Sequence, residues 1–352
     1  MNIQTGFPTP QKDYYKVYVH SITYNQASYI EDCLNGVAMQ QTEFPFVHHV
    51  IDDCSTDGEQ KVIKAWIERE CDLETAEYYD NDLCTITLAK HNINPNYTIA
   101  AYFLKKNMYG KPKKRELFKP WENVCPYIAF CEGDDYWVNK NKLQEQVLTL
   151  ANNPSATMCH TSFLCVDQNR NCIFRPRYEE YKKRSRTGDC LSELLIHGNY
   201  PMTLTCMISK KVISSELYAK CPYRYDYALF LCAAMLGDFV YIDKEFSCYR
   251  YVESGAMANG TITKLSMPLR VYCLGLISKS AIVKPISIFR RIIIYSHFLN
   301  MRFVCDKSKK SKDLYEFFRY RPWLYMLVFV VPYIKIHDFL CRKKINPDIL
   351  DE

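Results

Sequence analysis

The sequence predicts an α/β fold, in which helices cover a mostly parallel sheet, followed by a helical and basic C-terminal appendage. Short apolar segments alternate with helix-like segments through the first half of the 352 residues. The strand-like segments are apolar throughout, as in parallel strands buried on both faces. Charge is divided unevenly, since residues 1–262 carry four more acidic than basic side chains and residues 263–352 carry ten more basic than acidic ones. With 48% hydrophobic residues the chain can bury a large core, which excludes disordered and disulfide-knot classes.

The chain begins with a predicted strand and helix. KVYVHSI at 16–22 is a short segment rich in β-branched and aromatic residues, which predicts a strand. Apolar residues follow at helical spacing over 29–38. Ser28 and Glu31 have the spacing of a capping box, so we expect the helix to begin there.

Two further strand and helix pairs follow. FVHHVI at 46–51 predicts the second strand, and Thr56 with Glu59 forms a second candidate capping box before an amphipathic helix. CTITL at 84–88 predicts the third strand, and YTIAAYFLKK at 97–106 is predicted to be the third helix.

A fourth strand, YIAFC at 127–131, precedes an acidic cluster. The later pattern is looser, with one helix predicted to begin at Asp226 and with strands predicted for ATMCHTSFLCV, TLTCMIS, DFVYI and FSCYRYV. We interpret this part as a second half that continues the sheet. The predicted parts are an N-terminal tail at 1–13, two halves of one domain at 14–155 and 156–262, and a helical basic region at 263–352.

Three polar clusters come directly after predicted strands, at 23–25, 52–53 and 132–135. In an open parallel sheet, ligands bind outside the carboxyl ends of the strands. We therefore expect the three clusters to line one crevice. For the pair at 52–53 alone, a polar turn before a helix is an equal alternative.

The third cluster contains the carboxylates of Glu132, Asp134 and Asp135. Three carboxylates at one strand end repel one another unless a cation or several donors compensate. Mg²⁺ or Mn²⁺ typically binds one or two protein carboxylates together with substrate phosphates. The cluster therefore fits a metal-diphosphate site, and a solvated turn is the alternative.

Together, VYVHSITYNQASYI, VIDDCSTDG and YIAFCEGDDYWVNKNKLQ, in this order and spacing, resemble segments of the family 2 glycosyltransferases. The resemblance covers residues 16–257 and implies a GT-A, Rossmann-like fold. It implies transfer of a sugar from a nucleotide diphosphate sugar to an acceptor hydroxyl, with inversion at the anomeric carbon and Mn²⁺ or Mg²⁺ as cofactor. Residues 14–155 would then bind the nucleotide sugar and residues 156–262 the acceptor.

The resemblance also implies a biological setting, that of bacterial polysaccharide or cell-surface glycan synthesis. A UDP-sugar is the most frequent donor in the family, and guanosine and thymidine diphosphate sugars remain open. The acceptor would be a glycan or a lipid-linked saccharide.

The same resemblance implies roles for individual side chains. Tyr24 would lie against the nucleotide base and Asp53 would bond to that base. The family's DxD motif appears as Glu132-Gly133-Asp134 followed by Asp135, so we expect the metal on Asp134 or Asp135, with Glu132 as a further candidate. The implied donor-binding residues are Ile22, Thr23, Tyr24, Asn25, Asp53, Glu132 and Asp134.

The segment YRYDYALFLCAAMLGDFVYIDKEFSCYRYVESGAM resembles the stretch that holds the family's catalytic base, which would be Asp226 here. A base must accept the acceptor's hydroxyl proton, and the alternative is an aspartate that only stabilises a helix N-terminus. Many relatives carry a histidine two residues after the arginine of the YR motif, where this chain has Val252 after Arg250. If that histidine helps bind metal or diphosphate, then Arg250, Glu253 or a water must replace it.

Two alternatives concern other segments. The lysine-rich segment at 111–115 is expected to be a solvated loop, and the alternative is that it gates the donor site.

The alternative function is a non-catalytic or nucleotidyltransferase-like nucleotide-binding protein at the membrane surface. A nucleotidyltransferase would need a glycine-rich, lysine-bearing loop after the first strand, and TYNQASY is not such a loop.

The basic C-terminal region suggests a location. Twelve uncharged residues at 323–334 would span about 18 Å as a helix, against a bilayer core of about 30 Å. Their basic flanks and terminal aromatics predict an interfacial helix, so residues 285–344 are the candidate contact with an anionic membrane. The alternative is packing on the catalytic domain, and nucleic acid is not expected as a partner. Because no leader or CxxC motif occurs, we expect a cytoplasmic protein, peripheral on the inner face of the plasma membrane.

Overall fold

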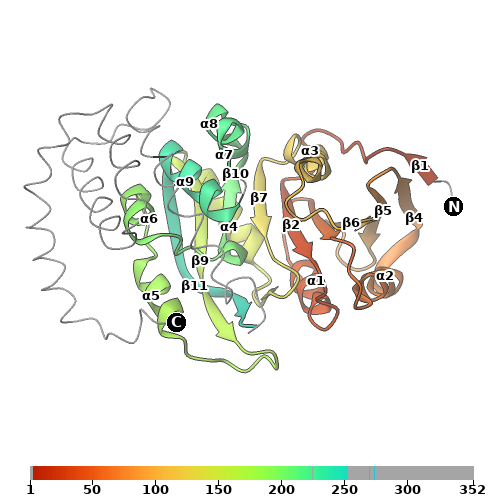
Figure 1. Cartoon of the computed structure of the whole chain (residues 1–352), viewed down its shortest axis with the longest axis horizontal. Helices are drawn as coiled ribbons and strands as arrows, with labels where there is room; N and C mark the ends of the chain where they lie inside the picture. Colours follow the sequence, from red (N-terminus) through yellow and green to blue (C-terminus); the bar gives the residue numbers. More distant parts are fainter. Residues whose placement is uncertain (1–2, 224, 253–268, 270–272, 274–352) are drawn as a thin grey trace, which may run out of the picture.

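The computed structural model describes residues 3–223 and 225–252, together with Leu269 and Cys273. In this part of the chain, eleven strands form one sheet in the order β1-β4-β5-β6-β3-β2-β7-β10-β9-β11-β8 (Figure 1). The strands are β1 Ile3–Thr5, β2 Val17–Thr23, β3 Phe46–Asp52, β4 Cys71–Asp80, β5 Cys84–His91, β6 Tyr97–Leu104, β7 Tyr127–Phe130, β8 Tyr136–Trp137, β9 Ala156–Val166, β10 Met207–Ser209 and β11 Asp238–Arg250.

Helices connect these strands and cover both faces of the sheet. The α-helices are α1 Ile30–Ala38, α2 Glu59–Glu70, α3 Lys119–Glu122, α4 Lys142–Asn152, α5 Pro176–Arg184, α6 Leu191–His197, α7 Lys210–Ile213, α8 Glu216–Lys220 and α9 Asp226–Leu236. Two 3₁₀ turns occupy Pro112–Leu117 and Thr203–Thr205. Among the residues described, no helix is both long and apolar enough to cross a membrane.

The sheet is mixed, and its centre is parallel. Strands β6, β3, β2 and β7 run parallel to one another, so their carboxyl ends meet at one edge. Antiparallel pairs lie on either side, with β4-β5-β6 on one side and β7-β10-β9 on the other. The predicted α/β class is confirmed, and β10 joins the first half of the chain to the second within a single sheet.

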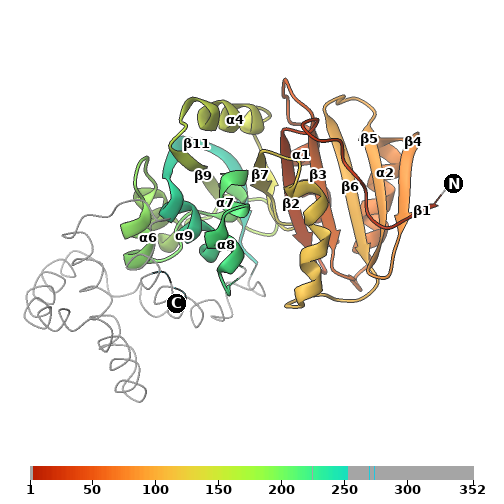
Figure 2. The ribbon, with the colours of Figure 1, turned by 90° about the horizontal axis from the view of Figure 1, so that it is seen from above.

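Two layers of side chains form the core around the central strands. On one face, Val17 and Val19 of β2 pack with α1, α2 and α4. On the other face, Tyr18 packs with Leu117 and with Trp121 of α3. Figure 2 shows α4 and α3 on opposite sides of the sheet. Alternate residues of one strand therefore face different helices, as the period of a strand requires.

Three predictions of local structure are wrong. The segment predicted as a third helix is strand β6, whose eight residues are all buried between β3 and β5. A segment in which Thr98 is the one small polar residue has no informative period, so its pattern did not separate helix from strand. Strand β4 was not predicted, because half of its side chains are exposed and most of those are polar. The two short strands predicted at 238–242 and 246–252 form a single strand, β11.

Both predicted capping boxes are also wrong. Helix α1 begins after Tyr29 and α2 begins after Gly58, which has a φ of 93°, and neither helix has a side-chain cap. The carboxylate of Glu59 turns away from its own helix end and bonds to residues that follow β2. The predicted start of α9 at Asp226 is confirmed.

Candidate active site

The polar clusters after β2, β3 and β7 lie side by side at the carboxyl edge of the sheet. The backbone N–H of Asp53 donates to the carbonyl oxygen of Thr23 at 3.0 Å, and that of Gly133 donates to Ile22 at 3.3 Å. The approach at Gly133 is so close that a Cβ there would fall 2.2 Å from Oγ1 of Thr23. The structure thus brings together the three clusters that the strand ends predicted.

Glu59 is the shared acceptor of this edge. Its carboxylate accepts hydrogen bonds from the Thr23 hydroxyl, from the backbone N–H of Gln26 at 3.0 Å and from the Ser55 hydroxyl at 2.8 Å. Burial raises the pKa of Glu59, and these three donors oppose that rise. No sequence pattern predicted this role, because the spacing of Thr56 and Glu59 indicated a capping box.

Tyr24 and Asn25 form the turn that follows β2. The side chain of Tyr24 remains 47% exposed. Asn25 has a φ of 56°, which asparagine tolerates better than most residues, and its Oδ1 accepts the backbone N–H of Thr56 at 2.8 Å. The turn is therefore fixed to the loop after β3 while the Tyr24 ring stays accessible at the edge.

Asp53 is buried and bonded on both carboxylate oxygens. Its Oδ1 accepts the backbone N–H of Met108 at 2.6 Å, and its Oδ2 accepts Nζ of Lys114 at 2.7 Å. Lys114 belongs to the lysine-rich segment predicted to be a solvated loop. That prediction is wrong for Lys114, although Lys111 and Lys113 are exposed.

The acidic residues after β7 have different surroundings. Asp135 is buried, and its Oδ1 accepts the backbone N–H of Arg250 at 2.8 Å. Burial and the charges of Asp134 and Glu132 raise its pKa well above the usual range. Burial also raises the pKa of Asp134, while the Gln26 side chain and Arg250 oppose that rise.

Glu132 carries the polar atom that most clearly lacks a partner in this cluster. Its Oε2 is buried and has no hydrogen-bond partner among the described residues. Burial, and next the charge of Asp134, raise the pKa of Glu132 to about 8, and Asp226 adds to the rise. Asp226 is linked to the segment after this cluster through Thr203, because the neighbouring Leu204 carbonyl oxygen accepts Nε1 of Trp137 at 3.0 Å.

The fit of a divalent metal can be tested on these carboxylates. In the described part of the chain, no three His, Cys, Asp or Glu side chains form a group that would hold a metal by themselves. Asp135 already accepts a backbone N–H, whereas Glu132 and Asp134 have oxygens to offer. Two hard oxygen donors at the sheet edge fit Mg²⁺ or Mn²⁺ that is completed by phosphate oxygens or water.

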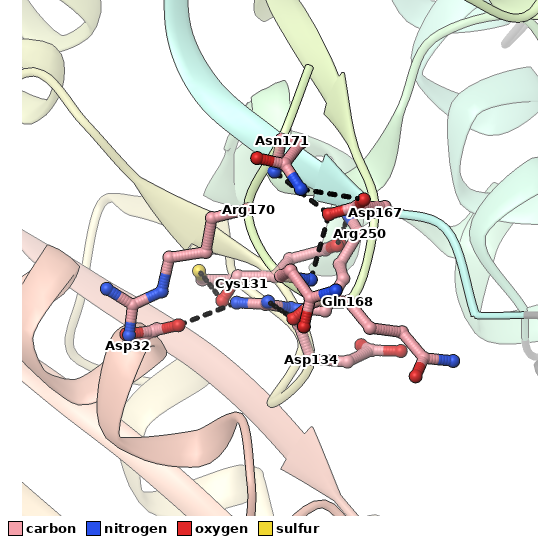
Figure 3. Close-up of polar contacts among 10 residues, drawn as sticks. Asp32, Cys131, Asp134, Asp167, Gln168, Arg170, Asn171 and Arg250 are labelled. Atoms are coloured by element: carbon pink, nitrogen blue, oxygen red, sulfur yellow. Dashed lines mark hydrogen bonds and ion pairs between the residues drawn. The ribbon is translucent and has the colours of Figure 1, made fainter. Parts of the chain in front are cut away.

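Arg250 ends β11 next to this cluster (Figure 3). Its guanidinium is bonded to the Asp32 carboxylate at 2.6 Å and to the carbonyl oxygens of Asp134 and Gln168 at 2.8 and 3.0 Å. The side chain is only 1% exposed. Arg250 is therefore engaged with the protein and does not open onto a phosphate site.

Asp226 is the first residue of α9, which packs in the second half of the chain. Its Oδ2 accepts the Asn199 side-chain amide at 2.9 Å and the Thr203 hydroxyl at 3.4 Å, and its Oδ1 accepts the N–H of Tyr227 at 2.7 Å. Burial raises the pKa of Asp226, and these three donors oppose the rise. Nothing in the sequence pattern singled out Asn199 or Thr203. The candidate replacement Glu253 lies outside the described residues.

Comparison with known proteins finds a family model and relatives that match part of the chain. Residues 18–89 match the model of "Glycosyl transferase family 2". The uncharacterised proteins Rv1520 of Mycobacterium tuberculosis and Mb1547 of Mycobacterium bovis are 33% identical over 139 residues, which is 40% of this chain. The aligned part spans about a third, 32%, of each relative's length.

A solved structure, that of TarS from S. aureus, shares the architecture. The TM-score is 0.51 at 17% identity, and the alignment covers 84% of this chain and 46% of TarS. At this identity the likeness shows the fold alone. At 84% of the chain, the structural alignment is much longer than residues 18–89.

Proposed function

We propose that this chain, which belongs to glycosyl transferase family 2 and has the GT-A fold, transfers a sugar from a nucleotide diphosphate sugar to an acceptor hydroxyl, with inversion at the anomeric carbon. One observation carries the proposal. Thr203, which donates to Asp226, belongs to the 3₁₀ turn Thr203–Thr205, and the Leu204 carbonyl oxygen of that turn accepts Nε1 of Trp137 at 3.0 Å, two residues after the acidic cluster. This connection supports a proton acceptor near the carboxylates that follow β7.

The donor nucleotide would bind across the ends of β2 and β3. The exposed ring of Tyr24 supports a role in stacking on the base. Asp53 lies beneath it, held by Met108 and Lys114, and would accept a hydrogen bond from the base on a remaining lone pair. Thr23 and Asn25 would hold this turn in place. We propose a UDP-sugar as the donor.

The diphosphate would lie over Glu132 and Asp134. Mn²⁺ or Mg²⁺ bound to these carboxylates would neutralise the charge that develops on the leaving diphosphate. Asp135 was an equal candidate ligand in the sequence, and its bond to the N–H of Arg250 supports a role in holding the loop. The orphaned Oε2 of Glu132 favours this residue as a ligand.

Asp226 would act as the general base. Its carboxylate accepts the proton of the acceptor hydroxyl as that oxygen forms a bond to the anomeric carbon. The bond from that carbon to the diphosphate oxygen breaks, and its electron pair leaves with the diphosphate. Attack opposite the leaving group inverts the anomeric configuration. Asn199 and Thr203 hold one oxygen of Asp226, and the N–H of Tyr227 holds the other, so the proton would be accepted on a remaining lone pair.

A panel of nucleotide sugars tests the proposal. Full-length protein is incubated with UDP-, GDP- and dTDP-sugars and Mn²⁺, with thermal shift to detect binding and nucleotide release to detect turnover. We expect one nucleotide class to stabilise the fold and to be turned over, and Asp226→Asn to bind it equally while turnover falls by about a hundredfold. Binding without turnover in the parent protein would favour the non-catalytic alternative.

A membrane location remains a proposal from the sequence. Residues 285–344, which carry the basic flanks and the uncharged segment, lie outside the described residues. We propose that they dock the enzyme on the inner face of the plasma membrane, where a lipid-linked saccharide would share its surface in polysaccharide or glycolipid synthesis. Full-length protein should float with anionic liposomes at low salt, and a chain ending near Lys307 should not. Equal flotation of the two would contradict the docking.

A further inference from the structure

Arg250 joins three segments that are far apart in the sequence. Its guanidinium is bonded to Asp32 of α1, to the carbonyl oxygen of Asp134 after β7, and to the carbonyl oxygen of Gln168 after β9. Figure 3 shows Arg250 between these groups. Each of the three guanidinium nitrogens thus donates to a different acceptor, in the fixed planar geometry of the group.

The surroundings of Arg250 are rigid on each side. The guanidinium carbon lies 4.7 Å from the ring centroid of Tyr29 and 5.2 Å from that of Tyr136, so two aromatic rings limit its movement. The turn that carries Gln168 is closed by the carboxylate of Asp167, which accepts the backbone N–H groups of Asn169 at 2.8 Å and Asn171 at 2.9 Å. Arg250 is thus bonded to anchored segments.

The bond to Asp134 is made to its backbone and not to its carboxylate. Nε of Arg250 donates to the Asp134 carbonyl oxygen at 2.8 Å, while the backbone N–H of Arg250 donates to Oδ1 of Asp135. One residue therefore holds two successive residues of the acidic loop at 132–135. The carboxylate of Asp134 remains available to the Gln26 side chain, which opposes the rise in its pKa caused by burial, and to ligands at the sheet edge.

We propose that Arg250 is a positioning residue for the acidic loop: it fixes the backbone at Asp134 so that this carboxylate faces the metal and diphosphate, and it does so without contacting the donor. This inference rests on the proposed function for its purpose, although the anchoring itself does not depend on any ligand. It also bears on Val252, which stands where many relatives have a histidine. Arg250 would hold the backbone of the acidic loop and would not replace that histidine as a ligand.

Arg170 is a matched control. Its guanidinium pairs with the other oxygen of Asp32 at 2.5 Å, but its side chain is 63% exposed and makes no hydrogen bond to the acidic loop among the described residues. Arg170→Ala therefore removes an arginine from the same carboxylate without removing the anchor of Asp134. Arg250→Lys keeps the charge and the backbone N–H to Asp135, but an ammonium on a flexible stem does not match the three separate acceptors.

Hydrogen exchange tests the anchoring directly. Peptides that cover 131–138 report the amides of Gly133, Asp135 and Val138, which are bonded to Ile22, Glu132 and Phe246. In full-length Arg250→Lys we expect these peptides to exchange faster by about tenfold or more, with peptides from α2 unchanged. In Arg170→Ala both regions should exchange as in the parent.

Calorimetry with UDP and Mn²⁺ connects the anchoring to the site. We expect Arg250→Lys to weaken Mn²⁺-dependent UDP binding by about tenfold, and Arg170→Ala to leave it unchanged. If Arg250→Lys lowers UDP affinity while exchange at 131–138 stays as in the parent, Arg250 contacts the donor and the positioning role is wrong. If neither exchange nor affinity changes, the role is also wrong.

Two further outcomes are distinguishable. If Arg250→Lys does not fold, Asp32→Asn is tested in its place, because the amide keeps the shape of the side chain and removes the charge that holds the guanidinium. Faster exchange at 131–138 in Asp32→Asn would support the positioning role, and exchange as in the parent would overturn it. If the parent protein does not bind UDP, GDP or dTDP with Mn²⁺, the proposed function is contradicted, while the exchange comparison still decides whether Arg250 anchors the loop.

Discussion

Lys114 and Asp53 form a largely buried ion pair, with Nζ 2.7 Å from Oδ2. Removing the lysine alone would leave a buried carboxylate without its partner charge. We expect Lys114→Met to lower the free energy of unfolding by about 3–5 kcal/mol, measured by urea denaturation at pH 7. Lys113→Met, at an exposed neighbour, should change it by less than about 0.5 kcal/mol. Adding Asp53→Asn to Lys114→Met should recover part of the loss, and equal midpoints for Lys114→Met and the parent would contradict the pair's structural role.

Gly133→Ala should damage both stability and donor binding. The added Cβ would meet Oγ1 of Thr23 at 2.2 Å and Oε1 of Gln26 at 2.5 Å, and Thr23 is buried and bonded to Glu59. We expect a loss of about 1–3 kcal/mol by denaturation, together with weaker UDP binding. At Gly6, where φ is 96° and the described structure leaves open space around a Cβ, alanine should cost about 1 kcal/mol of backbone strain and leave UDP affinity unchanged. A Gly133→Ala variant with parental stability and affinity would show that this approach is looser than described.

Substitutions of Asp134 and Asp135 should have opposite consequences. Asp134→Ala removes a metal ligand and relieves repulsion with Glu132, so Mn²⁺-dependent UDP binding should be lost while the unfolding midpoint stays the same or rises. Asp135→Ala leaves the backbone N–H of Arg250 without its acceptor, so unfolding should become easier by about 1–3 kcal/mol. Calorimetry with Mn²⁺ and with chelator, beside urea denaturation, separates the two. Equal UDP affinity with metal and with chelator would rule out the metal role.

Asn199→Leu should shift the pH dependence of turnover. Asp226 must be deprotonated to accept a proton, burial raises its pKa, and the Asn199 amide lowers it. Without that amide, and with Asp226 still buried, the pKa of Asp226 should rise further. The acidic limb of the kcat profile should therefore move to higher pH, by on the order of one unit, while the donor KM changes little. A lower kcat with an unmoved limb would mean that Asn199 acts only on the fold or on the acceptor.

His49→Phe should make the free energy of unfolding depend less on pH below pH 6.5. Both ring nitrogens of His49 are buried with no hydrogen-bond partner among the described residues, and burial holds its pKa well below 6.5. Below pH 6.5 the unfolded chain binds a proton at this residue and the native chain does not, so stability is complete above that pH and falls as pH drops. Between pH 6.5 and pH 5 the variant should lose about 2 kcal/mol less than the parent.

His48→Phe is the comparison for this effect. The ring of His48 is bonded to Ser21 at 2.8 Å and to Tyr97 at 3.0 Å, and burial lowers its pKa to about 3. This variant should show a similar change of slope but also a loss of about 1–3 kcal/mol at pH 7, because two buried hydroxyls lose their partner. Parallel pH curves for His49→Phe and the parent would contradict the buried neutral histidine.

The sequence predicts those site residues that lie at or directly after the ends of recognisable strands. Strands β2, β3 and β7 have recognisable apolar patterns, so Thr23, Asp53 and Asp134 fall at one edge as soon as the strands are parallel neighbours. The start of α9 at Asp226 was also predicted, because a helix start is local, whereas a role for Asp226 as base came from the family resemblance.

The missed contacts are those between distant segments. Glu59 bonds to Thr23, Lys114 to Asp53 and Arg250 to Asp32, and in each case the second residue belongs to another segment of the chain. No local spacing encodes such a pair. Strand β6 was missed for a different reason: apart from Thr98 its residues are apolar or aromatic, so the segment has no period that would distinguish a strand from a helix.

The position of β10 has a consequence during synthesis of the chain. Strand β7 is complete at Phe130, but its partner on that side, β10, ends only at Ser209, 79 residues later. At translation rates of about 5–20 residues per second, the nascent sheet would present an unpaired apolar edge for roughly 4–16 s. Exposed strand edges of this kind pair readily with other chains. Ribosome-associated chaperones would thus meet this protein at a defined stage, and fragments that end between the two strands should aggregate when expressed alone.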